Sequence, residues 1–192
     1  NKGLHILTAL AIPAAVGMFL IADEAVVLFF GKNFTNSIFA TRILSISIAT
    51  VAFSNYIGMQ ILVTMGKEKI TTISTVCGAV TNIVLNFFLI RNYFHNGAAI
   101  ASAITEGLVM IIQLVLAERY IQLKFGGKKV VIATIVMGIF VSCIKLLSVP
   151  LVFKLFLECL IGGCVYFIVL LVLKDEFANS IFNIITRYTK RK

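Results

Sequence analysis

The sequence predicts an all-α fold, a polytopic membrane bundle of about six transmembrane helices. Hydrophobic residues make up 60% of the 192 residues and charged residues only 13%. Soluble domains average about 45–50% apolar and about 25% charged residues. The mean hydropathy is +1.04, and the apolar residues form runs of about 20 or more, the length that crosses a bilayer. We therefore expect lipid to be the solvent for most of the surface.

Six apolar runs are expected to form one bundle over residues 1–173. The runs are 4–30, 36–65, 70–90, 97–119, 130–149 and 151–173. In the first run, Pro13 is expected to kink the helix, because proline lacks the amide donor and clashes with the preceding turn. Asp23 and Glu24 interrupt the same run, so we expect Ala25–Phe30 to be a short interfacial or broken piece.

The gaps between the later runs carry residues that begin or end helices. Thr35 and Asn36 are candidate N-caps of the second helix, because short polar side chains accept hydrogen bonds from free amide groups. Residues 66–69 separate the second and third helices, residues 91–96 the third and fourth, and residues 148–150 the last two. None of these gaps has the composition of a flexible linker or of a soluble domain.

The basic residues predict the orientation of the bundle, because loops on the cytoplasmic side carry an excess of Lys and Arg. With the N-terminus placed inside, twelve basic residues lie on the inner side and four on the outer side, with Arg42 left unassigned. The outer four are Lys32, Arg91, Lys145 and Lys154. We therefore expect both ends of the chain to face the cytoplasm.

Residues 174–192 are expected to form a cytoplasmic amphipathic helix and a basic tail. Apolar residues recur there at helical spacing, from Phe177 to Tyr188, with polar residues between them. Such a helix lies on the membrane surface, where each Lys or Arg gains about 1 kcal/mol from anionic headgroups. A frayed, solvated terminus is the alternative.

Composition and spacing argue against several functions. The net charge of +9 does not indicate nucleic-acid binding, because the basic residues lie between the apolar runs and not among stacking aromatic residues. No Ser-His-acid or metal-ligand spacing is visible, so the sequence indicates a protein that is not an enzyme and holds no metal or cofactor. The chain begins at Asn1, almost directly in an apolar run, and we expect it to be the C-terminal part of a longer protein.

Hydroxyl and amide side chains form a stripe along each of two predicted helices. Such stripes share one helix face because their members are three or four residues apart. Four of these residues are candidates for lining a substrate or ion path: Ser54, Thr75, Asn82 and Asn86. Hydrogen bonding between helices is an equally open interpretation of the Asn82–Asn86 pair.

Two charged residues are further candidates for the path. Glu106 lies about ten residues into the fourth run, where inserting an acidic side chain costs about 2.5–3.5 kcal/mol. We expect it to face a cavity on an ion or substrate path; accepting hydrogen bonds from a neighbouring helix is the structural alternative. Arg42, like Lys145, has apolar flanks. It either anchors the chain at the interface or faces a cavity and meets an anionic group such as a diphosphate.

The order of several motifs resembles the polysaccharide flippases of the MATE-like superfamily, which flip O-antigen and capsule repeat units. The resemblance covers about residues 3–120. The motifs that carry it are Ala11-Ile12-Pro13 with Gly17, Leu28 to Phe34, Gln60 to Leu62 with Met65 to Lys69, Asn82 to Asn86, and Asn96 to Glu106.

This resemblance implies that the six helices are the last six of about fourteen. It implies a transporter in the bacterial cytoplasmic membrane that moves undecaprenyl-diphosphate-linked oligosaccharides between leaflets, for cell-surface polysaccharides such as lipopolysaccharide. Coupling to an H+ or Na+ gradient is expected. The implied partners are the lipid-linked oligosaccharide, membrane lipids and an N-terminal lobe that this chain lacks. A multidrug or cation antiporter of the same fold is the main alternative; a membrane-embedded glycosyltransferase would need a large extramembrane loop, which the sequence does not show.

Overall fold

The computed structural model describes residues 2–120 and 127–181, and this part of the chain is helical with no strand. The all-α prediction is confirmed. The elements are α1 (Lys2–Phe30), η1 (Lys32–Ser37), α2 (Ile38–Asn55), η2 (Tyr56–Val63), α3 (Glu68–Ala117), α4 (Lys128–Lys145) and α5 (Leu151–Val172). A further helical segment covers residues 176–181.

Helix α1 is continuous where the sequence predicted an interruption. It runs from Lys2 to Phe30 with Pro13 inside it, and Asp23 and Glu24 are followed by helix up to Phe30. The expected broken piece at Ala25–Phe30 is therefore wrong. Both carboxylates have cationic partners on other helices, which removes the cost that was expected to break the helix.

The connection from α1 to α2 is a short 3-10 helix of six residues. Gly31 precedes it with a φ of 89°, a value that glycine adopts without strain. Residues 32–37, which include the predicted caps Thr35 and Asn36, lie in this turn, so α2 begins at Ile38, two residues later than expected. At its other end α2 continues into η2, a π-helix.

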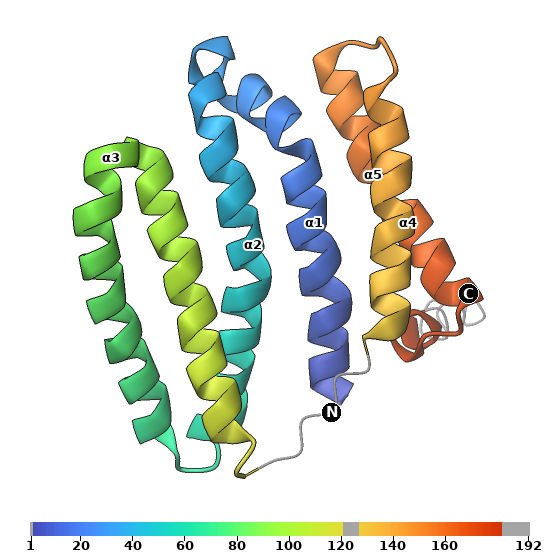
Figure 1. The fold of residues 1–192 in the computed structure, drawn as a ribbon. Helices are drawn as coiled ribbons and strands as arrows, with labels where there is room; N and C mark the ends of the chain where they lie inside the picture. Colours follow the sequence, from blue (N-terminus) through green and yellow to red (C-terminus); the bar gives the residue numbers. More distant parts are fainter. Residues whose placement is uncertain (1, 121–126, 182–192) are drawn as a thin grey trace.

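Helix α3 folds back on itself as a hairpin of two antiparallel legs (Figure 1). The reversal is at Phe94, with φ 49° and ψ −129°, inside the predicted gap at residues 91–96. Gly97 packs directly against the backbone at Leu89, where a Cβ atom would collide with the carbonyl oxygen. With 50 residues, α3 is about 75 Å of helix, enough for two passes of about 20 residues each.

Helices α4 and α5 form an antiparallel pair that packs against α1. Pro150 ends the link between them and lies just before the first residue of α5, a position that suits proline because helix N-termini have free amides. The core of this part consists of small and apolar side chains from α1, α4, α5 and the last segment: Ala9, Val130, Ala133, Met137, Val141, Tyr166, Leu170 and Ala178.

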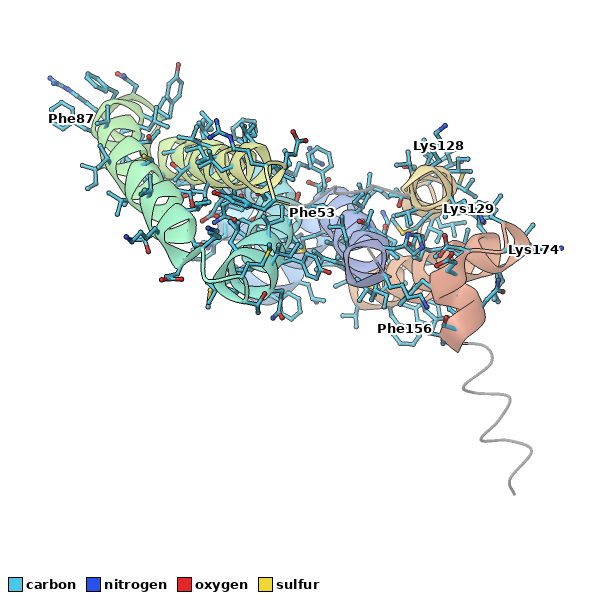
Figure 2. The ribbon with its side chains drawn as sticks, turned by 90° about the horizontal axis from the view of Figure 1, so that it is seen from below. Phe53, Phe87, Lys128, Lys129, Phe156 and Lys174 are labelled. Atoms are coloured by element: carbon cyan, nitrogen blue, oxygen red, sulfur yellow. The ribbon has the colours of Figure 1, made fainter. Side chains whose placement is uncertain are left out.

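The helices stand side by side in an elongated row, with the hairpin of α3 at one end and α4 and α5 at the other (Figure 2). Four helical segments in the described chain are long and apolar enough to cross a membrane: α1, residues 32–63, α3 and α5. Large apolar side chains cover the outside of the row, Phe87 and Phe156 among them. The chain is a multi-pass membrane protein whose outer surface suits lipid.

One end of the row carries basic residues. Lys128 and Lys129 begin α4, Lys174 follows α5, and all three lie at the same end (Figure 2). The Nζ atom of Lys129 donates a hydrogen bond to the carbonyl oxygen of Lys174, at 3.0 Å. Asp175 then caps the segment 176–181 by accepting from the amide of Phe177. The rest of the predicted amphipathic helix and tail, residues 182–192, lies outside the described residues.

Candidate functional site

Six charged side chains from four helices meet where α1 and α4 end and α2 and α5 begin, at the end of these helices opposite to Lys128, Lys129 and Lys174. Helix α1 supplies Asp23 and Glu24, α2 supplies Arg42, α4 supplies Lys145, and α5 supplies Lys154 and Glu158. The end of α1, the start of α2, the end of α4 and the start of α5 lie together in Figure 1. We call these six residues the charge cluster.

The ion pairs of the charge cluster centre on the two acidic residues of α1. Asp23 Oδ2 lies 2.6 Å from Arg42 Nη2 and 3.5 Å from Lys145 Nζ. Glu24 Oε2 lies 3.1 Å from Lys145 Nζ, and its Oε1 lies 3.5 Å from Lys154 Nζ. Helix α1 therefore makes ion pairs with neighbours on two sides. It pairs with α2 through Arg42 and with the α4–α5 pair through Lys145 and Lys154.

Local structure places these lysines. Lys145 lies in the last turn of α4, where the helix dipole favours a cation. Lys154 lies in the first turns of α5, and the short link between the helices brings it back to Lys145. Its Nζ atom donates to the carbonyl oxygen of Lys145 at 2.9 Å, which satisfies a carbonyl that the end of α4 leaves free.

Glu158 is the most deeply buried member of the charge cluster. Its side chain is on the same face of α5 as Lys154, one turn further into the helix, and the residue is 1% exposed. Neither carboxylate oxygen has a hydrogen-bond partner among the described residues. It interacts electrostatically with Glu24, Lys145, Lys154 and Asp23. A buried, unpartnered carboxylate of this kind is costly and is a common mark of a functional position inside a membrane.

A second polar group joins the two legs of α3. The amide of Asn86 donates to Asn82 Oδ1 at 2.7 Å, and the amide of Asn82 donates to Thr105 Oγ1 at 3.3 Å. Asn86 Oδ1 is buried without a partner in the described structure. Both interpretations of the Asn82–Asn86 pair therefore stay open. The hydrogen bonds connect the two legs of α3, as a structural role requires, and Asn86 Oδ1 remains an unused acceptor, as a path-lining role allows.

A third polar group lies between α3 and the end of the second helix. Gln113 is 2% exposed and donates to Ser74 Oγ at 3.1 Å. Thr71 Oγ1 donates to the carbonyl oxygen of Gly58 at 3.3 Å, beside the π-helix η2. Ser54 is buried one turn before Gly58. π-helical turns free backbone carbonyls and are frequent at functional sites.

The remaining predicted site residues are Thr75, Glu106 and Arg42. Thr75 is exposed and donates to the carbonyl oxygen of Thr71 within its own helix, at 2.9 Å. Glu106 is half-buried and makes no hydrogen bond or ion pair with any residue that the structure describes. Arg42 belongs to the charge cluster, and its guanidinium also lies 5.7 Å from the centre of the Phe19 ring.

Sequence reasoning did not select Asp23, Glu24, Lys154 or Glu158 as site residues. Two signals could have identified them. Lys154 and Glu158 are four residues apart in an apolar run, a spacing that places opposite charges on one helix face. Asp23 and Glu24 are acidic residues within a spanning run, as Glu106 is.

An apolar groove of about 610 Å³ runs along the contact between α1 and α4. Its lining is Ile12, Val16, Leu20, Val131, Thr134, Ile135, Gly138, Ile139, Ser142, Cys143 and Leu146. Leu20 lies one turn before Asp23 and Leu146 follows Lys145, so the groove ends beside the charge cluster. In the described residues, His, Cys, Asp and Glu side chains form no group of three at metal-binding spacing.

Comparison with known proteins finds similarity, at low identity, to membrane proteins that include two described as flippases. No protein-family model matches it. It is 24% identical over 180 residues to the probable low-salt glycan biosynthesis flippase of Haloferax volcanii, covering 92% of this chain and 38% of that protein. It is 25% identical over 154 residues to the lipid II flippase MurJ of Bacillus subtilis, covering 79% of this chain and 28% of that protein.

A third relative is an uncharacterised membrane protein of Methanocaldococcus jannaschii. It is 27% identical over 155 residues, which cover 81% of this chain and 30% of that protein. The chain therefore spans about a third of the length of the curated relatives it matches. It is similar to proteins described as flippases, and the similarity extends over most of its own helices.

Proposed function

We propose that the whole protein flips undecaprenyl-diphosphate-linked oligosaccharide repeat units across the bacterial cytoplasmic membrane. The observation that carries the proposal is that 79–92% of this chain aligns, at 24–25% identity, with two proteins described as flippases. One is described by a role in glycan biosynthesis and the other by its cargo, lipid II. A glycan attached to a lipid is the cargo that we infer from the two descriptions together.

The structure supports the proposal by offering a surface for each part of such a substrate. A polyprenyl tail is apolar and fits the groove between α1 and α4. A diphosphate is anionic and fits Arg42 and Lys145, whose side chains keep 39% and 24% of their surface exposed in the charge cluster. Sugars need hydroxyl and amide partners, which Asn82, Asn86 and the groups around Gln113 provide.

In this proposal the chain supplies six spanning helices over residues 1–173, with α4 and each leg of α3 crossing the membrane. The C-terminus faces the cytoplasm, and the basic end formed by Lys128, Lys129 and Lys174 lies on that side. A second, N-terminal lobe completes the cavity, and rocking of the two lobes gives alternating access. The chain by itself is expected not to transport.

A multidrug or cation antiporter of the same fold is the second candidate. It gains support from the charge cluster, because Asp23, Glu24 and Glu158 are carboxylates within helices and could bind a cationic substrate. Against it, Asp23 and Glu24 are already paired with three cationic side chains, Arg42, Lys145 and Lys154. A diphosphate on Arg42 and Lys145 would compete with the same ion pairs, so the similarity to two proteins described as flippases decides, and we favour the flippase.

The experiment is leaflet translocation of a labelled undecaprenyl-diphosphate oligosaccharide by the full-length protein in liposomes. We expect flipping by the wild type and a loss of at least tenfold in Arg42→Gln. Arg91→Gln is the matched control, because Arg91 is exposed at the turn of α3 and has no charged partner among the described residues. Efflux of cationic dyes without flipping of any glycolipid would replace the proposal by the antiporter.

A further inference from the structure

The carboxyl group of Glu158 is the feature of this structure that most needs a chemical explanation. It is 1% exposed, and neither oxygen has a hydrogen-bond partner among the described residues. An ionised carboxylate in that position loses its hydration and gains no hydrogen bond in return. The group must therefore take up a ligand, and the smallest ligand that removes the charge is a proton.

Charged groups face Glu158 from each helix that packs around it. Helix α1 presents Glu24 and Asp23, α4 presents Lys145, and Lys154 lies on the same helix as Glu158. Arg42 of α2 joins through Asp23. With all six groups of the charge cluster ionised, three acidic and three basic residues balance; with Glu158 protonated, the charge cluster carries one positive charge.

The observed ion pairs match the protonated form. Lys145 and Lys154 both pair with Glu24, and neither makes an ion pair with Glu158. An ionised Glu158 would compete with Glu24 for the same two ammonium groups. Loss of the proton would therefore change how the α4–α5 pair is held against α1, because these lysines provide the charged contacts between them.

The exposed fraction of the side chains in the charge cluster decreases from the end of the bundle toward Glu158. The side chain of Asp23 is 40% exposed, that of Lys145 24%, and that of Glu24 8%. This series of ionisable groups leads from the end of the bundle to the buried carboxyl and gives a proton a path. A metal cation is disfavoured there, because two ammonium groups repel it and the carboxylates do not converge as metal ligands would.

We propose that Glu158 is the proton-binding site that couples this protein to a proton gradient. A hydronium ion at the exposed end of the charge cluster gives up a proton, an O–H bond forms on a Glu158 oxygen, and nothing is oxidised or reduced. The coupling part rests on the proposed function, whereas the protonation of Glu158 does not. Release of the proton draws Lys145 or Lys154 from Glu24 toward Glu158 and shifts the α4–α5 pair.

The first test is infrared difference spectroscopy of the full-length protein in lipid, recorded across a pH titration. We expect a carbonyl stretching band of a protonated carboxylic acid that shifts in D2O and is lost in Glu158→Gln. Glu176→Gln is the matched control, because Glu176 is exposed just after α5, and it should keep the band. Glu158→Asp retains a carboxylic acid and should move the band without removing it. A band that survives unshifted in both Glu158 variants would overturn the proposal.

The second test separates this proposal from the proposed function. In proteoliposomes, a pH gradient should accelerate glycolipid flipping by the wild type, and Glu158→Gln should flip at one rate with or without the gradient. Replacing the pH gradient by a sodium gradient should have no effect in either. Gradient-driven flipping by Glu158→Gln would overturn the proposal. If the wild type moves no glycolipid, the proposed function fails, and the infrared result alone decides whether Glu158 carries the proton.

Discussion

The phenol of Tyr166 on α5 donates a hydrogen bond to the carbonyl oxygen of Ala9 on α1, at 2.6 Å. In an α-helix that carbonyl would accept from the amide four residues later, which is the position of Pro13. Proline has no amide hydrogen, so Tyr166 supplies the donor that Pro13 removes. This contact explains how α1 stays continuous through a half-buried proline.

Tyr166→Phe is therefore expected to leave a buried carbonyl without a donor. The free energy of unfolding should fall by about 1–3 kcal/mol, measured by denaturant titration of the full-length protein in detergent micelles. Tyr93→Phe should have no effect, because Tyr93 is exposed and makes no hydrogen bond within the described residues.

Pro13→Ala tests the same relationship from the other side, since it restores the missing amide donor. In the Pro13→Ala background, Tyr166→Phe should cost clearly less than it does alone, so the two substitutions should be non-additive. Additive effects would mean that Tyr166 does not compensate for the proline.

Gly97→Ala should disrupt the hairpin of α3. The added Cβ would overlap the carbonyl oxygen of Leu89, and backbone cannot move aside as a flexible side chain can. We expect a loss of folded protein equivalent to more than about 3 kcal/mol, since such clashes belong to the most damaging substitutions. Gly107→Ala is the control in the same helix, because nothing lies within 4 Å of its added Cβ. Equal yields of monodisperse protein for the two variants would contradict this account of the turn.

Glu24→Gln should destabilise the contact between α1 and the α4–α5 pair. The substitution leaves Lys154 without its carboxylate partner and Lys145 with Asp23 alone, and breaking one side of a buried ion pair typically costs about 3–5 kcal/mol. Unfolding of the full-length protein in detergent is the measurement. Glu118→Gln serves as the control, because Glu118 is exposed at the end of α3.

A double-mutant cycle then isolates the pair itself. Lys145→Met alone should be destabilising, and in the Glu24→Gln background it should cost much less, since the lysine has already lost a partner. A Lys145→Met cost that is the same in both backgrounds would show that Glu24 and Lys145 do not interact.

The course of the helices could be predicted from the sequence because hydropathy and turn residues are local signals. The gap at residues 91–96 contains the observed reversal at Phe94, and Pro150 precedes α5 as its position suggested. The break at Asp23 and Glu24 was wrong for a non-local reason. Their partner Lys145 lies 122 residues along the chain from Asp23. Hydropathy does not predict which helices pack together.

The candidate site was predictable only in part for the same reason. Arg42 was selected from its apolar flanks and does lie in the charge cluster, where Asp23 is its partner. The pairing of Asn82 with Asn86 follows from their spacing of four residues, whereas its continuation to Thr105 depends on the hairpin. The π-helix η2 has no sequence signal comparable to proline or glycine, and it was not foreseen.

Glu106→Gln distinguishes a residue on the substrate or ion path from one that holds helices together. Glu106 makes no hydrogen bond or ion pair with the described residues, so the substitution should change the free energy of unfolding by less than about 0.5 kcal/mol. A residue on the path should nevertheless affect transport, and we expect glycolipid flipping by the full-length protein to fall at least fivefold. Flipping assays and unfolding titrations on the same preparation give both readouts. Unchanged flipping together with reduced stability would assign Glu106 to helix packing, because substitution of a path residue should reduce flipping and leave stability unchanged.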